Sequence, residues 1–244
     1  MKFHSNTDNL PITYYKEKFR PQYHFSPKRN FINDPCGLVY FQGEYHLFYQ
    51  YNPFDMDQDP NILYWGHAIS TDLLHWNHMP IALAPDDNGG ISTGCAVVDW
   101  KNTSGLFAGK PGLIIIFVYV RYDVFEAPAI AYSDDRGRTW EKLNTHVPLI
   151  DPAPSGQLKD VKIFWHKPDK KWIMVSTSDV LRIFSSPNLL EWTHESDIVG
   201  VRSECPDLFE LPITNDNSNT KWVLSLAGRS YHLGSFDGHE FKVE

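Results

Sequence analysis

Three carboxylates at equivalent places in a repeating sequence are the residues of this chain best suited to chemistry. Asp34, Asp160 and Glu204 each stand just before an apolar stretch, and Thr93 holds the corresponding place in a further segment. Two carboxyl groups flanking a sugar bond are the minimum for glycoside hydrolysis, because one attacks or activates water while the other protonates the leaving oxygen. On spacing alone, such acids could equally cap strands or bind a cation. The pattern therefore indicates an acidic funnel, with sugar chemistry as one interpretation of it.

The elements that must position these carboxylates are short β-strands. Stretches rich in aromatic and β-branched residues are separated by Gly, Pro, Asn and Asp, and no window keeps a 3.6-residue apolar period long enough for a helix. The clearest stretches are 37–41, 45–50, 113–120, 129–132, 161–165, 172–176 and 222–226. We therefore expect an all-β chain.

A turn sequence that closes on an aromatic residue recurs along the chain. Its copies are Ser70–Trp76, Ser133–Trp140, Ser186–Trp192 and Ser235–Phe241. They lie roughly 50 to 65 residues apart, which leaves room for about four short strands per repeat and is typical of β-propeller blades. The first strand of a blade lines the central channel, so the three carboxylates should converge on its axis, where they repel one another unless chemistry or a ligand uses them. We predict a β-propeller with about four recognisable blades.

The composition argues against several classes of partner. The chain has 244 residues, and 22 Lys+Arg against 30 Asp+Glu give a formal net charge of −8. Nucleic acids and anionic membranes require clustered positive charge, so we expect neither. Residues 1–10 lack the apolar core of a secretory signal, which taken alone predicts a cytoplasmic protein. The 3 cysteines form no CxxC pair and the 11 histidines show no zinc-site spacing, so we expect no metal and no cofactor.

Four ordered motifs resemble those of glycoside hydrolase family 32, which contains invertases, inulinases and levanases. The motifs are Phe31–Leu38 with its Asn-Asp-Pro, Phe48–Pro53, Tyr64–Ala68 and Glu204–Leu211. The resemblance runs from about Tyr23 to Phe241 and implies a five-bladed propeller followed by a β-sandwich. Because only four blade-like repeats are visible, we expect the fifth blade and the sandwich to be absent from this chain. We predict an N-terminal extension at 1–22 and an incomplete catalytic propeller at 23–244.

The same resemblance implies roles for the carboxylates in cleaving terminal β-D-fructofuranosyl bonds of sucrose or fructans. Asp34 would be the nucleophile, Glu204 the acid/base and Asp160 the stabiliser of the transition state. The family retains anomeric configuration, so Asp34 and Glu204 should lie about 5 Å apart. The residues expected to bind the fructoside substrate are Asn33, Gln50, Trp65, Thr93 and Lys159. The family is often extracellular, in contrast to what the N-terminus predicts.

The residues around the carboxylates depart from the family's pattern. Phe31 stands where the family has Trp, Cys36 where it has Asn, and Ser92 where it has an aromatic residue. Lys159 and Val161 replace Arg and Pro on either side of Asp160. Lysine keeps the positive charge but loses the planar fork of arginine, which holds two hydroxyl groups at once. These changes predict an atypical or weak enzyme.

Two alternative functions stay open on the sequence. One is a catalytically silent propeller that binds fructosides or a protein partner, which the altered residues around the carboxylates favour. The other is a fructosyltransferase that uses the same carboxylates, with a sugar hydroxyl in place of water. An incomplete propeller would also leave strand edges unpaired, and we expect these to allow self-association.

Overall fold

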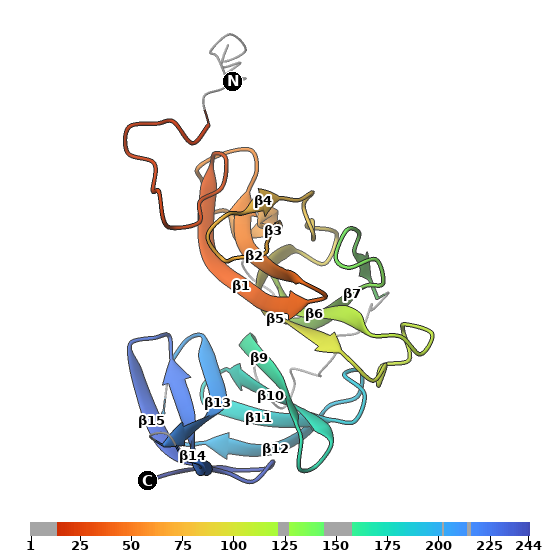
Figure 1. The fold of residues 1–244 in the computed structure, drawn as a ribbon, viewed down its shortest axis with the longest axis vertical. Coiled ribbons are helices and arrows are strands. Elements are labelled where there is room, and N and C mark those ends of the chain that lie inside the picture. The colour runs from red at the N-terminus through yellow and green to blue at the C-terminus, as the bar shows by residue number, and fades with distance from the viewer. Residues whose placement is uncertain (1–13, 122–126, 144–157, 202, 214–215) are drawn as a thin grey trace.

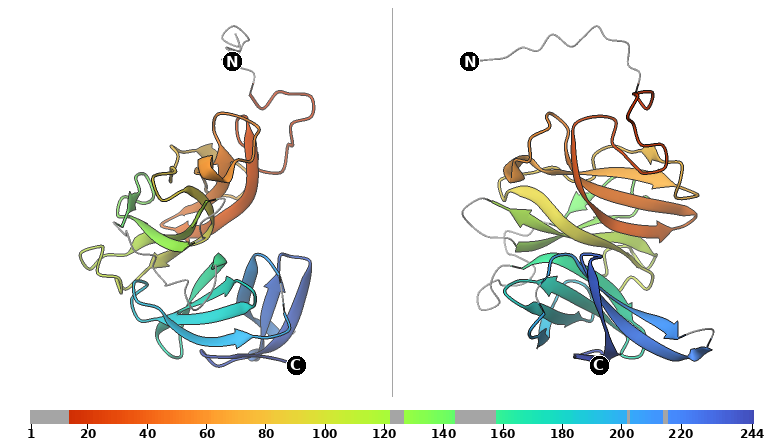
Figure 2. Two further views of the ribbon diagram at one scale, coloured as in Figure 1. Left: turned by 180° about the vertical axis from the view of Figure 1, so that it is seen from behind. Right: turned by 90° about the vertical axis from the view of Figure 1, so that its left-hand side faces the viewer.

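The protein folds into four antiparallel sheets that follow one another along the chain (Figures 1 and 2). The computed structural model describes residues 14–121, 127–143, 158–201, 203–213 and 216–244. Each sheet consists of four consecutive strands whose order in space is their order in the chain, and we call the sheets blades 1 to 4. This meander is the arrangement of propeller blades, so the prediction of an all-β, four-bladed propeller is confirmed.

The strands of the first two blades span residues 31–142. Blade 1 contains β1 (Phe31–Phe41), β2 (Glu44–Asn52), β3 (Tyr64–Ser70) and β4 (Asn77–His78), with a short 3-10 helix, η1 (Pro60–Ile62), before β3. Blade 2 contains β5 (Gly90–Asp99), β6 (Gly112–Val120), β7 (Ala127–Ser133) and β8 (Glu141–Lys142). The strand β6 is a continuous apolar run because both faces of blade 2 are covered by neighbouring blades.

The strands of the last two blades span residues 159–243. Blade 3 contains β9 (Lys159–His166), β10 (Lys171–Thr177), β11 (Leu181–Ser186) and β12 (Thr193–Ile198). Blade 4 contains β13 (Pro206–Ile213), β14 (Asp216–Leu226), β15 (Ser230–Phe236) and β16 (Phe241–Val243). The first strands of successive blades contact one another, β1 with β5, β5 with β9 and β9 with β13, so they line the centre of the molecule.

The hydrophobic core lies in the three seams between neighbouring blades. Phe48, Trp65 and Phe117 pack between blades 1 and 2, and Ile116 and Trp172 belong to the cluster between blades 2 and 3. A third cluster joins blades 3 and 4. A sheet with two apolar faces can bury both of them only by packing between two other sheets, and apolar residues therefore recur in every blade.

The recurring turns predicted from the sequence join the third and fourth strands of the blades. In blade 2, the Asp135 carboxylate accepts hydrogen bonds from the Arg138 N–H at 2.9 Å and from the Ser133 hydroxyl at 2.7 Å. Asp72, Asn188 and Asp237 accept equivalent backbone hydrogen bonds in blades 1, 3 and 4. The side chain of each turn therefore satisfies backbone groups that the turn leaves unpaired.

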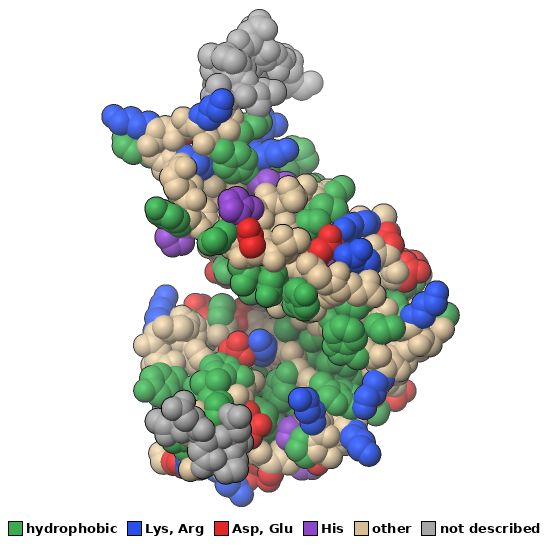
Figure 3. All heavy atoms as spheres, viewed as in Figure 1, with side chains coloured by type: hydrophobic (Ala, Val, Ile, Leu, Met, Phe, Trp, Pro, Cys, Tyr) green, Lys and Arg blue, Asp and Glu red, His purple; other side chains and the backbone are tan. Residues whose placement is uncertain are grey.

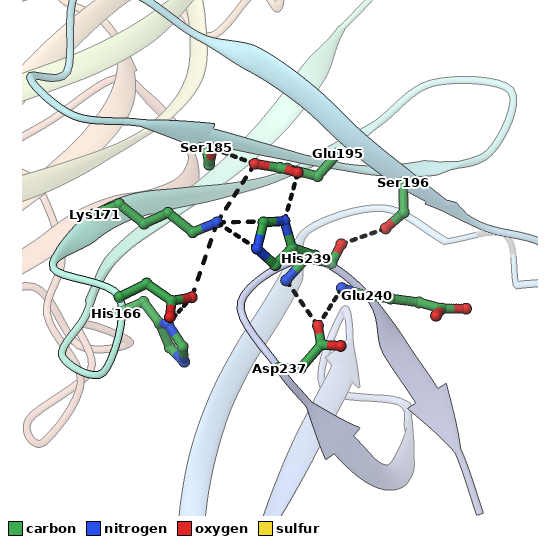
Figure 4. Close-up of polar contacts among 9 residues, drawn as sticks. His166, Lys171, Ser185, Glu195, Ser196, Asp237, His239 and Glu240 are labelled. Carbon is green, nitrogen blue, oxygen red and sulfur yellow. Dashed lines mark hydrogen bonds and ion pairs between the residues drawn. The ribbon is translucent and has the colours of Figure 1, made fainter.

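Two of these turns also dock onto the preceding blade. In the turn of blade 2, Arg138 binds Glu44 of blade 1 through both carboxylate oxygens, at 2.7 and 2.8 Å. In the turn of blade 4, His239 Nδ1 lies 2.7 Å from Glu195 of blade 3, beside Lys171, as Figure 4 shows. Gly238 lies so close to blade 3 that a Cβ atom there would be 1.9 Å from the Asp169 carboxylate. These turns therefore lock neighbouring blades together.

The N-terminal segment covers part of blade 1. Phe25 packs against Tyr49 with ring centroids 4.9 Å apart, and Tyr15 stacks on His78. Arg20 holds the segment in place by donating to Pro27 O at 2.6 Å and pairing with Glu17. Residues 1–13 of the predicted extension lie outside the described residues, and the boundary at residue 22 stays a prediction.

Blades 1 and 4 stand at the two ends of the series (Figure 1), and β1 and β13 do not make the contacts that join the other first strands of the described chain. Large apolar side chains are exposed on both end blades: Leu38 and Tyr40 in blade 1, and Leu211, Tyr231 and Leu233 in blade 4. Self-association through this edge stays a prediction. The described part of the chain has no helix of the length and apolarity that crossing a membrane requires.

Candidate active site

Three carboxyl groups from three blades meet at the start of the central strands. Asp34 lies on β1 and is partly buried. Burial raises its pKa above the ordinary range, and the negative charges of Asp160 and Glu204 raise it further. Asp34 and Asp160 line one cavity, and Glu204 immediately precedes Cys205, which lines it too.

Asp160 is held from two neighbouring blades. Asp160 is the second residue of β9, and the residue is only 8% exposed. Its N–H donates to the Thr93 hydroxyl of blade 2 at 3.1 Å, and its Oδ2 accepts the Cys205 N–H, which immediately precedes blade 4, at 3.2 Å. The backbone of Asp160 and of Cys205 is left-handed, with φ of 53° and 47°. Such conformations cost energy in residues other than glycine, and they cluster where function requires a fixed geometry.

Glu204 is the most accessible of the three carboxylates. It lies in a bend just before β13 and is exposed, and the Ser203 hydroxyl donates to its carbonyl oxygen at 3.1 Å. The neighbouring Cys205 thiol faces the same charges, since burial together with Asp160, Asp34 and Glu204 raises its pKa to about 12. Lys159 opposes that shift, which places its ammonium group near the carboxylates. The thiol therefore stays neutral at physiological pH.

A cavity of about 450 Å³ opens beside these groups. It is lined by residues of the first strands of all four blades, among them Asp34, Thr93, Asp160 and Cys205. A volume of this size is typical of sites for small ligands. Deeper along the same strands, Lys162 of β9 pairs with Asp207 of β13 at 3.0 Å, which joins blades 3 and 4 a second time.

The other residues predicted to bind substrate lie around this cavity in different ways. Asn33 is exposed and donates through its side-chain amide to Gln50 at 3.0 Å, so the two residues form one polar unit on blade 1. Thr93 faces the cavity and supports Asp160. Trp65 has no exposed surface, and its indole N–H donates to Ser92 O at 2.6 Å. Trp65 therefore supports β5 from beneath and offers no face to a ligand in this conformation.

Two features of the site escaped the sequence analysis. The first is the Cys205 N–H as a donor to Asp160, because a backbone group leaves no trace in residue types. The second is Lys162, whose pairing with Asp207 is a contact between blades 3 and 4 that residue types and spacing do not predict. Within the described residues, no group of three or more His, Cys, Asp or Glu side chains is arranged to hold a metal ion.

A protein-family model matches the sequence of this chain. Residues 24–243, nearly the whole chain, match the model described as the N-terminal domain of glycosyl hydrolases family 32. The chain belongs to glycosyl hydrolase family 32. Its resemblance to the family's motifs in the sequence is therefore confirmed, and its propeller is that of the family's N-terminal domain.

Family 32 proteins of several organisms are similar to this chain. A levanase of Bacillus subtilis is 42% identical over 98% of this chain and 37% of its own length, and Invertase 1 of Saccharomyces cerevisiae is 38% identical over 92% and 46%. A solved fructofuranosidase of Schwanniomyces occidentalis, complexed with fructose, superimposes with a TM-score of 0.82 at 35% identity, over 97% of this chain and 50% of that one. The chain thus spans half or less of the length of these relatives.

Proposed function

We propose that the protein is a glycosidase that hydrolyses terminal β-D-fructofuranosyl bonds of sucrose or fructans with retention of configuration. One observation carries the proposal: Asp34 of blade 1 and Asp160 of blade 3 line one cavity, and Glu204 immediately precedes Cys205, which lines the same cavity and donates its N–H to Asp160. Retaining glycosidases need two carboxyl groups with different tasks and therefore different surroundings. Asp34 is partly buried and Glu204 is exposed, so their surroundings differ; because the general acid is the group that needs a raised pKa, the bound sugar must shield Glu204 from water.

In the first step, an Asp34 carboxylate oxygen attacks the anomeric carbon, C2, of the fructosyl unit. The bond from C2 to the bridging oxygen breaks, and Glu204 gives its proton to that oxygen, so that an alcohol leaves and a covalent fructosyl ester remains on Asp34. In the second step, Glu204 takes a proton from water, whose oxygen attacks C2 and releases Asp34. Both residues then return to their original protonation states.

Asp160 acts on the substrate as the stabiliser of positive charge at C2. Its position is set from both sides, by Thr93 and by the Cys205 N–H, and such preorganised groups stabilise developing charge at little cost in reorganisation. Asn33 offers its exposed amide to sugar hydroxyls, which suits a neutral polyol, and the buried Gln50 orients it through their hydrogen bond. The printed names of the relatives, a levanase and an invertase, support fructans and sucrose as substrate classes.

Release of fructose from sucrose, inulin and levan by the purified 244-residue chain tests the proposal. Asp34→Ala and Glu204→Ala should each lower the rate by a factor of about 10³ or more. Asp87→Ala, which removes an exposed carboxylate outside the site, should leave it unchanged. Oligosaccharide products at high sucrose would identify a transferase instead, and fructoside binding without product would identify a binding module.

A further inference from the structure

A second cavity lies at the opposite end of the strands that carry the carboxylates. It has a volume of about 610 Å³ and is lined by the ends of β1, β5 and β9, whose beginnings carry Asp34, Thr93 and Asp160. The two cavities adjoin at Ala96, which lines both, while strands rise about 3.3 Å per residue, so the six residues from Asp34 to Tyr40 place Tyr40 at most roughly 20 Å from Asp34. We call this cavity the far pocket, formed chiefly by Tyr40, Trp100, Lys101, Trp165, Lys167 and Trp172.

The walls of the far pocket are aromatic and accessible. Trp100 is 59% exposed and Tyr40 is 53% exposed, although tryptophan and tyrosine are usually well buried. Trp165 and Trp172 pack edge to face with centroids 5.1 Å apart and form the opposite wall. On the face shown in Figure 3, hydrophobic side chains gather over β5 and β9, with Lys and Arg side chains at their margin. Such a surface offers flat apolar faces to a ring-shaped ligand.

The rim of the far pocket is positively charged. Lys101 lies 5.3 Å from the centroid of the Trp165 ring, and neither Lys101 nor Lys167 forms an ion pair with any residue that the structure describes. The carboxylate in the lining, Asp99, is fully buried and accepts four hydrogen bonds from Thr103 and Ser104. Two lysines without partners therefore stand beside apolar walls in a protein whose net charge is −8.

The far pocket is also built rigidly. The hydrogen bonds to Asp99 hold the turn that carries Trp100 and Lys101, and the Trp172 indole N–H donates to the Thr103 hydroxyl at 2.9 Å. One wall from blade 3 is thereby tied to the turn from blade 2. A pocket held in this way needs little ordering when a ligand binds, which favours affinity.

We infer that the far pocket binds a small organic anion that carries a ring with an apolar face. This chemistry is shared by aromatic carboxylates and by phosphorylated sugars, since both join a ring to an anionic group. A neutral sugar would leave both lysines without a partner, and a volume of about 610 Å³ suits a small molecule. The three carboxylates at the other end of the strands repel anions, so the far pocket is distinct from the proposed active site and does not depend on its function.

Equilibrium dialysis of the full chain against four probes tests this inference. The probes are fructose 6-phosphate, indole-3-carboxylate, neutral fructose and inorganic phosphate. We expect saturable binding of at least one of the two ring-bearing anions, with fructose and phosphate binding at least about tenfold more weakly. Binding of fructose 6-phosphate would indicate a phosphorylated sugar as the ligand, and binding of indole-3-carboxylate would indicate an aromatic carboxylate. Either result supports the proposed site.

Variants locate the binding. Trp100→Ala and Lys101→Met should each weaken it about tenfold, the effect of losing one charge-assisted contact. Lys110→Met, which removes an exposed lysine from the same turn, should change it by less than about twofold, and so should Asp34→Ala. Trp100 and Lys101 are exposed, and thermal unfolding confirms that the variants fold. The inference would be overturned by absence of saturable binding of both ring-bearing anions, by fructose or phosphate binding that is equally tight and weakened by the pocket variants, or by insensitivity of anion binding to both pocket variants.

Discussion

The Cys205 N–H donates to the Asp160 carboxylate at 3.2 Å and so joins blade 4 to blade 3 directly beside Glu204. Both residues have left-handed backbone conformations, and Asp160 is tied in addition to Thr93 of blade 2. Glu204 and Asp160, the proposed acid/base and stabilising residues, are therefore positioned by one continuous set of contacts across three blades. Positioning of this kind matters because errors of about 1 Å can cost a hundredfold in rate.

Asp160→Asn tests the electrostatic part of this arrangement. The amide keeps an oxygen that accepts the Cys205 N–H but removes the negative charge that helps to raise the pKa of Asp34. We expect kcat to fall by a factor of about 10²–10³, since charge stabilisation at C2 is lost. The acid limb of the kcat/KM profile reports the pKa of the ionised nucleophile and should move to lower pH. An acid limb that stays in place or moves to higher pH would contradict the proposed proximity.

Asp34→Asn should make the chain more stable while abolishing activity. The folded state raises the pKa of Asp34, so the ionised carboxylate destabilises the fold once the pH exceeds its ordinary value. Removing this cost should raise the melting temperature. The gain should be present at pH 7 and vanish below about pH 3, where the carboxyl is protonated in both states. Thermal unfolding as a function of pH measures it, and a less stable variant at pH 7 would refute this account.

The buried pair His46 and His67 predicts a loss of stability in mild acid. Their ring nitrogens lie 3.1 Å apart in the seam of blades 1 and 2. Burial, with a smaller contribution from the charge of Arg138, lowers the pKa of His46 to about 4 and that of His67 to about 3, although Glu44 opposes the shift of His46. Both rings stay neutral in the fold, whereas the unfolded chain takes up protons below its ordinary pKa of about 6.5, so stability falls between pH 6.5 and about 4.

His67→Gln checks this prediction. The variant should lose about 1 kcal/mol at pH 7, where a hydrogen bond in the seam is disturbed. It should also lose less stability than the parent chain between pH 7 and pH 5, because one proton-binding group is gone. Parallel pH profiles of the melting temperature for the two chains would contradict the assignment.

The cluster in Figure 4 predicts a second effect of pH, at the seam of blades 3 and 4. Burial raises the pKa of Glu195, but hydrogen bonds from Ser185 and His239 and the charge of Lys171 outweigh burial and lower it. Glu195→Gln should destabilise the chain by about 1–2 kcal/mol at pH 7. The difference should shrink as the pH falls below about 4, where the parent carboxylate is protonated. Glu240→Gln is the control, because this exposed side chain pairs with Lys242 and with no other basic residue that the structure describes. An equal effect of both variants would contradict the role of Glu195 in holding blades 3 and 4 together.

The blade architecture could be predicted from the sequence because its signals are local. Each turn such as Ser133–Trp140 satisfies its own backbone groups, and each strand carries its own apolar pattern. The three carboxylates were predictable for the same reason, since they occupy one position in successive repeats. The features that the sequence could not predict depend on contacts between blades.

Trp65 shows this limit. Its place in a family motif predicts a wall of the pocket, yet the ring is fully buried because its indole N–H reaches Ser92 O of the next blade. The neutral histidine pair and the left-handed backbone of Cys205 are likewise set by packing between strands far apart in the chain. Residue types alone do not predict these contacts between strands.

Mass spectrometry of Glu204→Gln after incubation with β-D-fructofuranosyl fluoride tests the central claim most directly. Fluoride leaves without the proton that Glu204 supplies in the first step, whereas the second step lacks its base, so a fructosyl ester should accumulate on the nucleophile. We predict one added fructosyl group on the peptide that contains Asp34, and none when Asp34 is also replaced by Ala. The account would be contradicted if the parent chain releases fructose but the adduct lies on a residue other than Asp34. It would also be contradicted if the parent chain, acting in aqueous methanol, released a methyl fructoside of inverted configuration.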